Sequence, residues 1–243
     1  MRYKLISSCL LLMAALSVSA QDKVTLSNGA VREGTIVKVD ASNLTLKMAA
    51  GEIALPRKDI SQIEIQKPAE VDAALKAAEA KKCADALPAL KAVTDKYTSL
   101  AIPWLQQAHV AMADCLIATG QWPGAVDAFK KLLEYYPKTS YALKAKVGLG
   151  QALVHEGKYD EALKLIEEAT QPLRKELTVS ADDNRFLGTA MIVLGDCYQA
   201  KGDLDQAIDC YLSTVVLYYR DKEAVQQAQQ KADKLKEKIK ASA

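Results

Sequence analysis

The sequence predicts a mainly α protein, an α-solenoid of helical hairpins that follows a small five-stranded β module. Two observations carry this prediction. Apolar residues alternate with a period of two up to about Gln66, and after Lys67 the period changes to about 3.6 while alanine becomes dense. Glycine, alanine and large apolar residues then recur in one order along the helical part, which indicates repeated hairpins.

Residues 1–20 have the pattern of a secretory signal peptide. Arg2 and Lys4 form a charged start, residues 5–16 form an apolar centre, and residues 18–20 form a small-residue cleavage site. The apolar run is shorter than the roughly 20 residues that a membrane-spanning helix needs, so export with cleavage is favoured over an anchor. We therefore expect a soluble, periplasmic or secreted protein with no integral membrane span after cleavage.

Residues 21–66 predict five short strands. Turn signals at Asn28-Gly29 and Ala50-Gly51 separate segments in which apolar and polar residues alternate. The strands are expected around residues 24–26, 31–39, 44–48, 53–55 and 60–65. A single hairpin would not bury enough surface to stand alone, so a small, strongly bent sheet or barrel is expected.

This module resembles the SH3-like small barrels and, more distantly, the Sm-like fold. The resemblance rests on LSNGAVREGTIVKVDASNLTLK and the strand that follows at residues 60–65. An Sm-like fold implies RNA binding, but residues 22–66 hold no Phe, Trp or Tyr on which a base could stack. They also hold six basic and six acidic side chains. A protein-contact module is therefore expected, and nucleic acid is not expected as a partner.

Residues 67–220 predict four helical hairpins. The first, at 67–103, is degenerate, and the three at 104–220 are better formed. Glycines end the first helix of each better hairpin, where a left-handed backbone favours this residue: Gly120, Gly157 and Gly202. Residues 221–243 predict a C-terminal capping helix, because one apolar stripe can face the array while the charged face meets water.

The hairpins resemble tetratricopeptide repeats (TPR). Two copies match the family pattern closely, through Leu149-Gly150, Tyr159 and Ala162 and through Leu194-Gly195, Tyr198 and Ala207. The segment GQWPGAVDAFKKLLEYYPKTSYALKAKVGLGQAL is similar to repeats in bacterial cell-envelope proteins, among them the Tol-Pal system coordinator and the accessory lipoproteins of outer-membrane protein assembly. The resemblance implies an α-solenoid that scaffolds protein complexes.

The resemblance also implies a partner-binding groove on the concave face, lined by the first helix of each repeat. The corresponding residues here are Gln107, Val110, Asp114, Ile117, Lys144, Val147, Gln151, Val154, Thr189, Ile192, Asp196 and Gln199. This mixture of aliphatic, amide and charged side chains suits an extended segment or an amphipathic helix. The alternative for each aliphatic position is packing against the next repeat.

Four cysteines follow the leader, each in a predicted helix at a core-like position: Cys83, Cys115, Cys197 and Cys210. Packing as free, buried thiols is the default interpretation. The alternative is a disulfide between Cys197 and Cys210, which lie on the two antiparallel helices of one hairpin at nearly opposed heights. No CxxC motif or Cys/His cluster with metal-ligand spacing occurs, so no metal site is expected.

The sequence holds few of the residues that catalysis would need. The two histidines, His109 and His155, fall in separate hairpins without a neighbouring metal or nucleophile motif, so each is interpreted as a surface or packing residue. No GxSxG, P-loop or GxGxxG motif is present. Removing Arg2 and Lys4 from the 32 basic residues leaves 30, equal to the 30 acidic ones, so bulk charge favours no anionic partner. An enzyme or a cofactor is not expected.

The sequence therefore predicts an exported, non-catalytic adaptor or scaffold that binds a protein or peptide partner in its groove, in cell-envelope assembly or maintenance. The alternative is a self-associating structural protein in which the β module mediates homo-oligomerisation.

Overall fold

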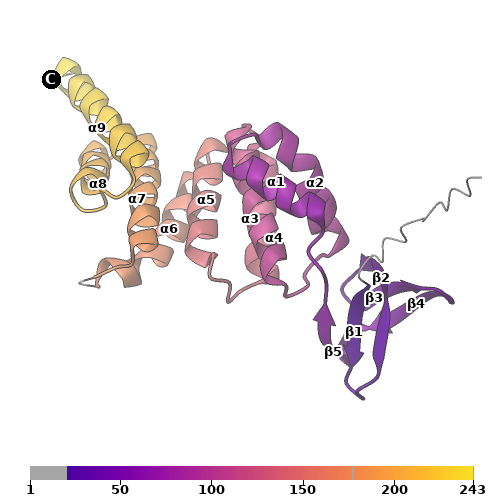
Figure 1. Ribbon diagram of the computed structural model, residues 1–243. Helices are drawn as coiled ribbons and strands as arrows, with labels where there is room; N and C mark the ends of the chain where they lie inside the picture. Colours follow the sequence, from indigo (N-terminus) through magenta and orange to yellow (C-terminus); the bar gives the residue numbers. More distant parts are fainter. Residues whose placement is uncertain (1–20, 177, 243) are drawn as a thin grey trace, which may run out of the picture. The chain divides into compact units, whose positions relative to one another are not determined.

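The computed structural model describes residues 21–176 and 178–242. The predicted signal peptide lies outside the described residues. The chain divides into two compact units, and the boundary falls between Gln66 and Lys67, where the apolar period changes (Figure 1).

The first unit is a five-stranded antiparallel sheet, which confirms the predicted β module. Its strands are β1 (Asp22–Leu26), β2 (Val31–Val39), β3 (Asn43–Met48), β4 (Gly51–Pro56) and β5 (Ile60–Glu64), and a short 3₁₀ helix, η1 (Arg57–Asp59), precedes β5. The strand order is β4-β3-β2-β1-β5, so the last strand returns to pair with the first. Val24, Ile36, Leu44 and Leu46 are fully buried and form its interior. The alternation of apolar residues therefore sets which face is buried.

The second unit consists of helices that follow one another as antiparallel pairs, and the predicted α-solenoid is confirmed (Figure 1). The helices are α1 (Ala69–Glu79), α2 (Cys83–Lys96), α3 (Pro103–Ala118), α4 (Trp122–Tyr135), α5 (Ala142–His155), α6 (Tyr159–Arg174), α7 (Ala181–Lys201), α8 (Leu204–Val216) and α9 (Lys222–Ser242). Gly120, Gly157 and Gly202 have φ of 71°, 75° and 84°, so these glycines hold the left-handed turns expected of them.

Neighbouring helices meet where a glycine of one receives a large side chain of the other. A Cβ placed on Gly195 of α7 would lie 2.7 Å from Cδ1 of Tyr211, whose ring is fully buried on α8. A Cβ on Gly150 of α5 would lie 2.6 Å from Cδ1 of Ile166 on α6. Because real Cβ atoms do not approach so closely, these positions accept only glycine at the observed helix spacing.

Both histidines pack against aromatic rings. His109 on α3 is 3% exposed and lies 5.7 Å from Tyr136 and 6.3 Å from Tyr135, measured between ring centroids. Neither of its ring nitrogens has a hydrogen-bond partner among the described residues. Burial lowers the pKa of His109 to about 4. His155 stacks on Trp122 with the ring centroids 3.7 Å apart.

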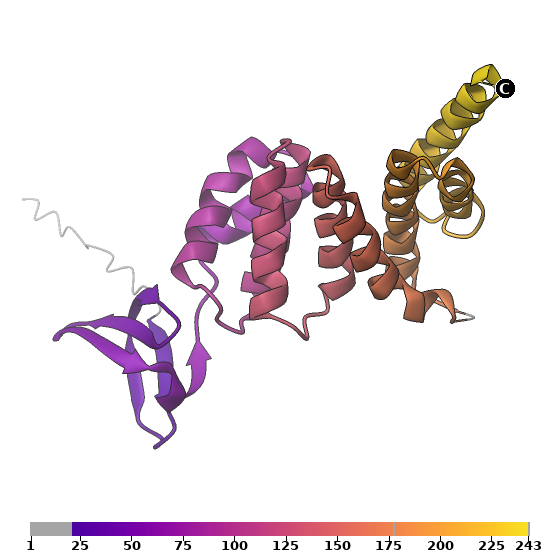
Figure 2. The same ribbon diagram turned by 180° about the vertical axis from the view of Figure 1, so that it is seen from behind.

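The helix α9 covers the end of the array. Ala224, Ala228, Ala232 and Leu235 on this helix are buried in one cluster with Ile192 of α7 and Tyr211 of α8. Asp196 of α7 accepts a hydrogen bond from the Tyr211 hydroxyl at 2.7 Å and pairs with the Lys231 ammonium of α9 at 2.6 Å. The C-terminal part of α9 runs on past α8 in both views (Figure 1, Figure 2).

The default interpretation of free thiols holds for Cys197 and Cys210 but is wrong for Cys83 and Cys115, which are bonded to each other. Cys197 and Cys210 are free, so the alternative of a disulfide between them is wrong. Burial raises the pKa of the Cys197 thiol to about 12 and that of Cys210 to about 11. The bonded pair is Cys83 and Cys115, with Cα atoms 4.9 Å apart. It joins α2, the second helix of the first hairpin, to α3, the first helix of the next hairpin. The predicted alternative considered only two cysteines within one hairpin.

The Gly195→Ala substitution tests the helix contact. The added methyl group must displace the Tyr211 ring, and we expect a loss of about 2–3 kcal/mol in the free energy of unfolding. Gly124→Ala on α4 is the matched control, because its Cβ would lie at an ordinary 3.5 Å from Leu116. That change should leave stability unaltered or raise it by up to about 1 kcal/mol. Urea unfolding followed by circular dichroism measures both, and equal effects would contradict the close-contact explanation.

The burial of His109 predicts a pH dependence of stability. Its pKa is about 4 in the folded chain against 6.5 for the ordinary side chain, so the unfolded chain binds more protons between these values. The stability that depends on a neutral His109 is fully present above pH 6.5. It is lost as the pH falls towards 4, and the free energy of unfolding decreases by about 3 kcal/mol in total. The His109→Leu variant should lack this loss, whereas His155→Leu should retain it. Urea unfolding at pH 7, 5.5 and 4 separates the variants, and parallel curves for His109→Leu and the natural chain would refute the assignment.

Candidate partner-binding groove

A hollow of about 500 Å³ lies between the first helices of three successive hairpins, α1, α3 and α5. Its apolar lining includes Leu75 and Ala78 of α1 and Val110, Ala111 and Ala118 of α3. Polar and charged side chains complete the lining: Glu79, Lys81, Gln107, Asp114, Tyr141 and Lys144. Protein interfaces likewise combine an apolar centre with polar and charged groups around it.

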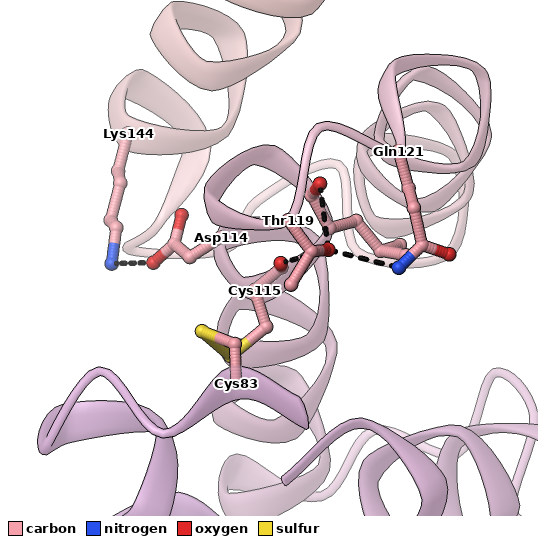
Figure 3. Close-up of a disulfide and its surroundings, with 7 residues drawn as sticks. Cys83, Asp114, Cys115, Thr119, Gln121 and Lys144 are labelled. Carbon is pink, nitrogen blue, oxygen red and sulfur yellow. Dashed lines mark hydrogen bonds and ion pairs between the residues drawn. A yellow bond between two sulfur atoms is a disulfide. The ribbon is translucent and has the colours of Figure 1, made fainter. Parts of the chain in front are cut away.

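Asp114 and Lys144 form an ion pair across the hollow, from α3 to α5. The carboxylate oxygen Oδ2 lies 2.6 Å from the ammonium nitrogen, and Figure 3 shows the two side chains pointing toward one another. Burial raises the pKa of Asp114, and the neighbouring Lys144 charge acts in the opposite direction. The side chains remain 42% and 33% exposed, so each can accept or donate a further hydrogen bond to a ligand.

The Cys83–Cys115 disulfide forms another part of the wall (Figure 3). Cys83 is the first residue of α2, and Cys115 follows Asp114 on α3. The bond joins residues 32 positions apart, and in the chain-entropy model a loop of this length contributes about 3–4 kcal/mol to stability. The bond therefore fixes the first hairpin against the second beside the hollow.

The structure brings together four of the predicted groove residues. Gln107, Val110, Asp114 and Lys144 line the hollow. Val110, Val147 and Ile192 are each only 3% exposed, as expected if these aliphatic side chains pack against neighbouring helices. The side chains of Ile117, Gln151, Val154 and Thr189 are half-buried outside the lining of this hollow.

The predicted groove residues of α7 have partners within the chain. Ile192 packs against the alanines of α9, and Asp196 holds Lys231 and Tyr211. Gln199 accepts a hydrogen bond from the Tyr211 hydroxyl at 3.1 Å. These three residues therefore hold the end of the array together, and α9 takes the place at which a partner was expected.

The first hairpin supplies lining residues that the sequence-based mapping did not include. The offset of 39 residues that relates Ala86 to Ala125 maps Asp114 onto Leu75 and Ile117 onto Ala78. Both mapped residues line the hollow. The repeat offset therefore identifies these two positions, although the predicted groove included residues of the three better-formed hairpins only. No repeat offset indicates that Cys83 and Cys115 form a disulfide.

A second, more open hollow of about 380 Å³ lies along α9. It is lined by Tyr219, Lys222, Val225, Gln226, Gln229 and Gln230. Tyr219 is more than half exposed, as are Val216 at the end of α8 and Leu217 directly after it. Nothing in this lining resembles a reaction centre, and no group of three or more potential metal ligands occurs in residues 21–176 and 178–242. Over the same residues, none of the helices combines the length and the apolar character of a membrane span.

Comparison with known proteins identifies the helical unit. Two models described as "Tetratricopeptide repeat" match residues 77–147 and 141–218. None of the curated proteins matches the chain significantly. Among solved structures, the TPR-like repeats of a kinesin light chain-like protein from Podosopora anserina superpose with a TM-score of 0.50 at 18% identity. That match covers 71% of this chain and 92% of the other.

Two structures of the protein MamA are also similar. MamA from Desulfovibrio magneticus RS-1 gives a TM-score of 0.46 at 18% identity and covers 72% of this chain and 98% of its own. MamA of AMB-1 gives 0.47 at 20% identity, with 70% and 99% covered. Likeness at these identities concerns the fold alone. The two family models together span most of the helical unit, and residues 77–218 of the chain therefore belong to the tetratricopeptide repeat family.

Proposed function

We propose that the protein is a non-catalytic adaptor that holds a segment of a partner protein in the hollow between α1, α3 and α5. The observation that carries this proposal is the hollow of about 500 Å³, whose lining combines apolar side chains with charged and polar ones. Its size accommodates a few side chains, and it is lined by successive first helices. An extended segment or one face of an amphipathic helix fits such a site, because apolar side chains can enter while the rim binds backbone groups.

The proposal includes export to the cell envelope, as a periplasmic or secreted protein. Two observations support this location. The pattern of residues 1–20 is that of a signal peptide. The Cys83–Cys115 disulfide belongs in an oxidising compartment, since cytosolic thiols are kept reduced. The likeness of residues 120–153 to the Tol-Pal coordinator and to outer-membrane assembly proteins favours a role in envelope assembly or maintenance.

A second candidate function is self-association through the β unit, which we infer to be SH3-like. The strand order β4-β3-β2-β1-β5 with a 3₁₀ turn before β5 supports this likeness. Strands β4 and β5 form the two edges, and Val31 and Val37 of β2 are 50% and 37% exposed. Light scattering of the full chain should then show a dimer that the Val31→Lys, Val37→Lys double variant converts to a monomer. A monomeric natural chain would contradict this second function.

The adaptor function predicts that filling the hollow removes partner binding. A photo-crosslinker at Gln107 should capture a defined protein from envelope extracts. The purified partner should then bind the chain with an affinity that Ala111→Trp reduces by at least about tenfold. Ala73→Trp is the matched control, because Ala73 is exposed on α1 and lies outside the hollow.

Isothermal titration of the natural chain and both variants measures the effect. Equal affinities for the three proteins would show that binding occurs elsewhere and would refute the groove.

A further inference from the structure

We propose that the Cys83–Cys115 bond is a thiol–disulfide exchange site that opens into the groove and controls the groove's shape. Its co-substrate is a dithiol, either a small molecule or a dithiol protein. The inference rests on the proposed function only where it concerns partner binding. The geometry of the bond and its surroundings carries the rest.

Both sulfur-bearing residues line the hollow, so the hollow is a route by which a thiolate can reach the bond. Cys83 is 8% exposed and Cys115 is 1% exposed. A thiolate must approach the sulfur it attacks along the S–S axis, so attack is favoured at the more exposed of the two residues. The attack is therefore assigned to Sγ of Cys83, with Cys115 as the leaving thiolate.

The exchange balances as a two-electron reduction. The first thiolate of the dithiol forms a bond to Cys83 Sγ, and the Cys115 thiolate leaves and takes up a proton. The second thiolate of the dithiol attacks the reductant's own sulfur in this mixed disulfide, and Cys83 leaves as a thiolate. Because Cys83 is the first residue of α2, the helix N-terminus stabilises this leaving thiolate. The dithiol becomes a disulfide, and its two protons end on the two cysteines.

The bond also holds one wall of the groove. Residues 80–82 form the turn between α1 and α2, next to Cys83, and Lys81 has a left-handed backbone with φ of 59°. Lys81 on this turn and Glu79, the last residue of α1, line the hollow. The Lys81 ammonium nitrogen also lies 3.4 Å from Oε2 of Glu223. The two side chains are 82% and 84% exposed, so this ion pair contributes little to holding the turn in place. The disulfide is thus the covalent tie between this wall and α3.

A ligand in the hollow and a reductant therefore compete. An occupant that covers Cys83 and Cys115 protects the bond, and reduction releases the wall on which the occupant rests. By linkage, each effect implies the other. Reduction should lower the affinity of the chain for its partner, and a bound partner should lower the equilibrium constant for reduction of the bond by the same factor.

The test uses differential alkylation and mass spectrometry of Cys83 and Cys115 in the native full chain under increasing dithiothreitol. We expect reduction without unfolding, and hydrogen exchange at residues 78–86 that accelerates by at least about tenfold on reduction. Ala111→Trp should slow reduction at least about tenfold, because the indole fills the route, whereas Ala73→Trp should not. Far-ultraviolet circular dichroism establishes that each protein is folded, and the Cys83→Ser, Cys115→Ser double variant should reproduce the fast exchange without reductant.

Three outcomes would overturn the inference. Reduction that occurs only after denaturation would exclude an exchange site. Equal reduction rates for the natural chain and folded Ala111→Trp would exclude the hollow as the route. Unchanged hydrogen exchange after reduction would exclude control of the wall. None of these measurements uses a partner, so a failure here is distinguishable from the failure of the adaptor function, which appears only in the titrations.

Discussion

The close approach of helices at glycine is the constraint on which the rest of the helical unit depends. Tyr211 lies against Gly195, Ile166 against Gly150 and Phe129 against Gly148, and at each contact a methyl group in place of hydrogen would overlap the neighbouring side chain. These contacts set the spacing of successive helices. In these contacts the glycines lie on first helices and the large side chains on second helices. The hollow between α1, α3 and α5 follows from this arrangement.

The two ends of the inner surface are completed differently. At the first hairpin, a covalent bond holds α2 to α3, and charged side chains remain at the rim of an open hollow. At the last hairpin, α9 lies on α7 and α8, and Asp196 is engaged by both Tyr211 and Lys231. An aspartate at the same repeat position therefore lines an open hollow in one repeat and joins neighbouring helices in another. Asp114 pairs with Lys144 of α5 at the open hollow, whereas Asp196 pairs with Lys231 of α9.

The sequence was sufficient for the architecture because its signals are local. Alternation of apolar residues places the five strands, and glycine at 120, 157 and 202 places the turns between helices. The groove was predictable only in part. Repeat offsets identify which residues face inward, but burial of Val147 and Ile192 depends on how closely the following helix approaches. The bonded cysteines were not predictable, because Cys83 and Cys115 meet through the stacking of separate hairpins, and no periodicity reports that contact.

The helix α9 covers an apolar surface of the hairpin formed by α7 and α8. A hairpin ends in an apolar surface that another hairpin can cover, and an uncovered end would accept the first hairpin of a second molecule and grow into a fibre. The buried face of α9 takes up this surface with Ala224, Ala228 and Ala232, while its outer face carries charge. The apolar surface of α7 and α8 that α9 covers is therefore closed to a further hairpin and to a second copy of the chain.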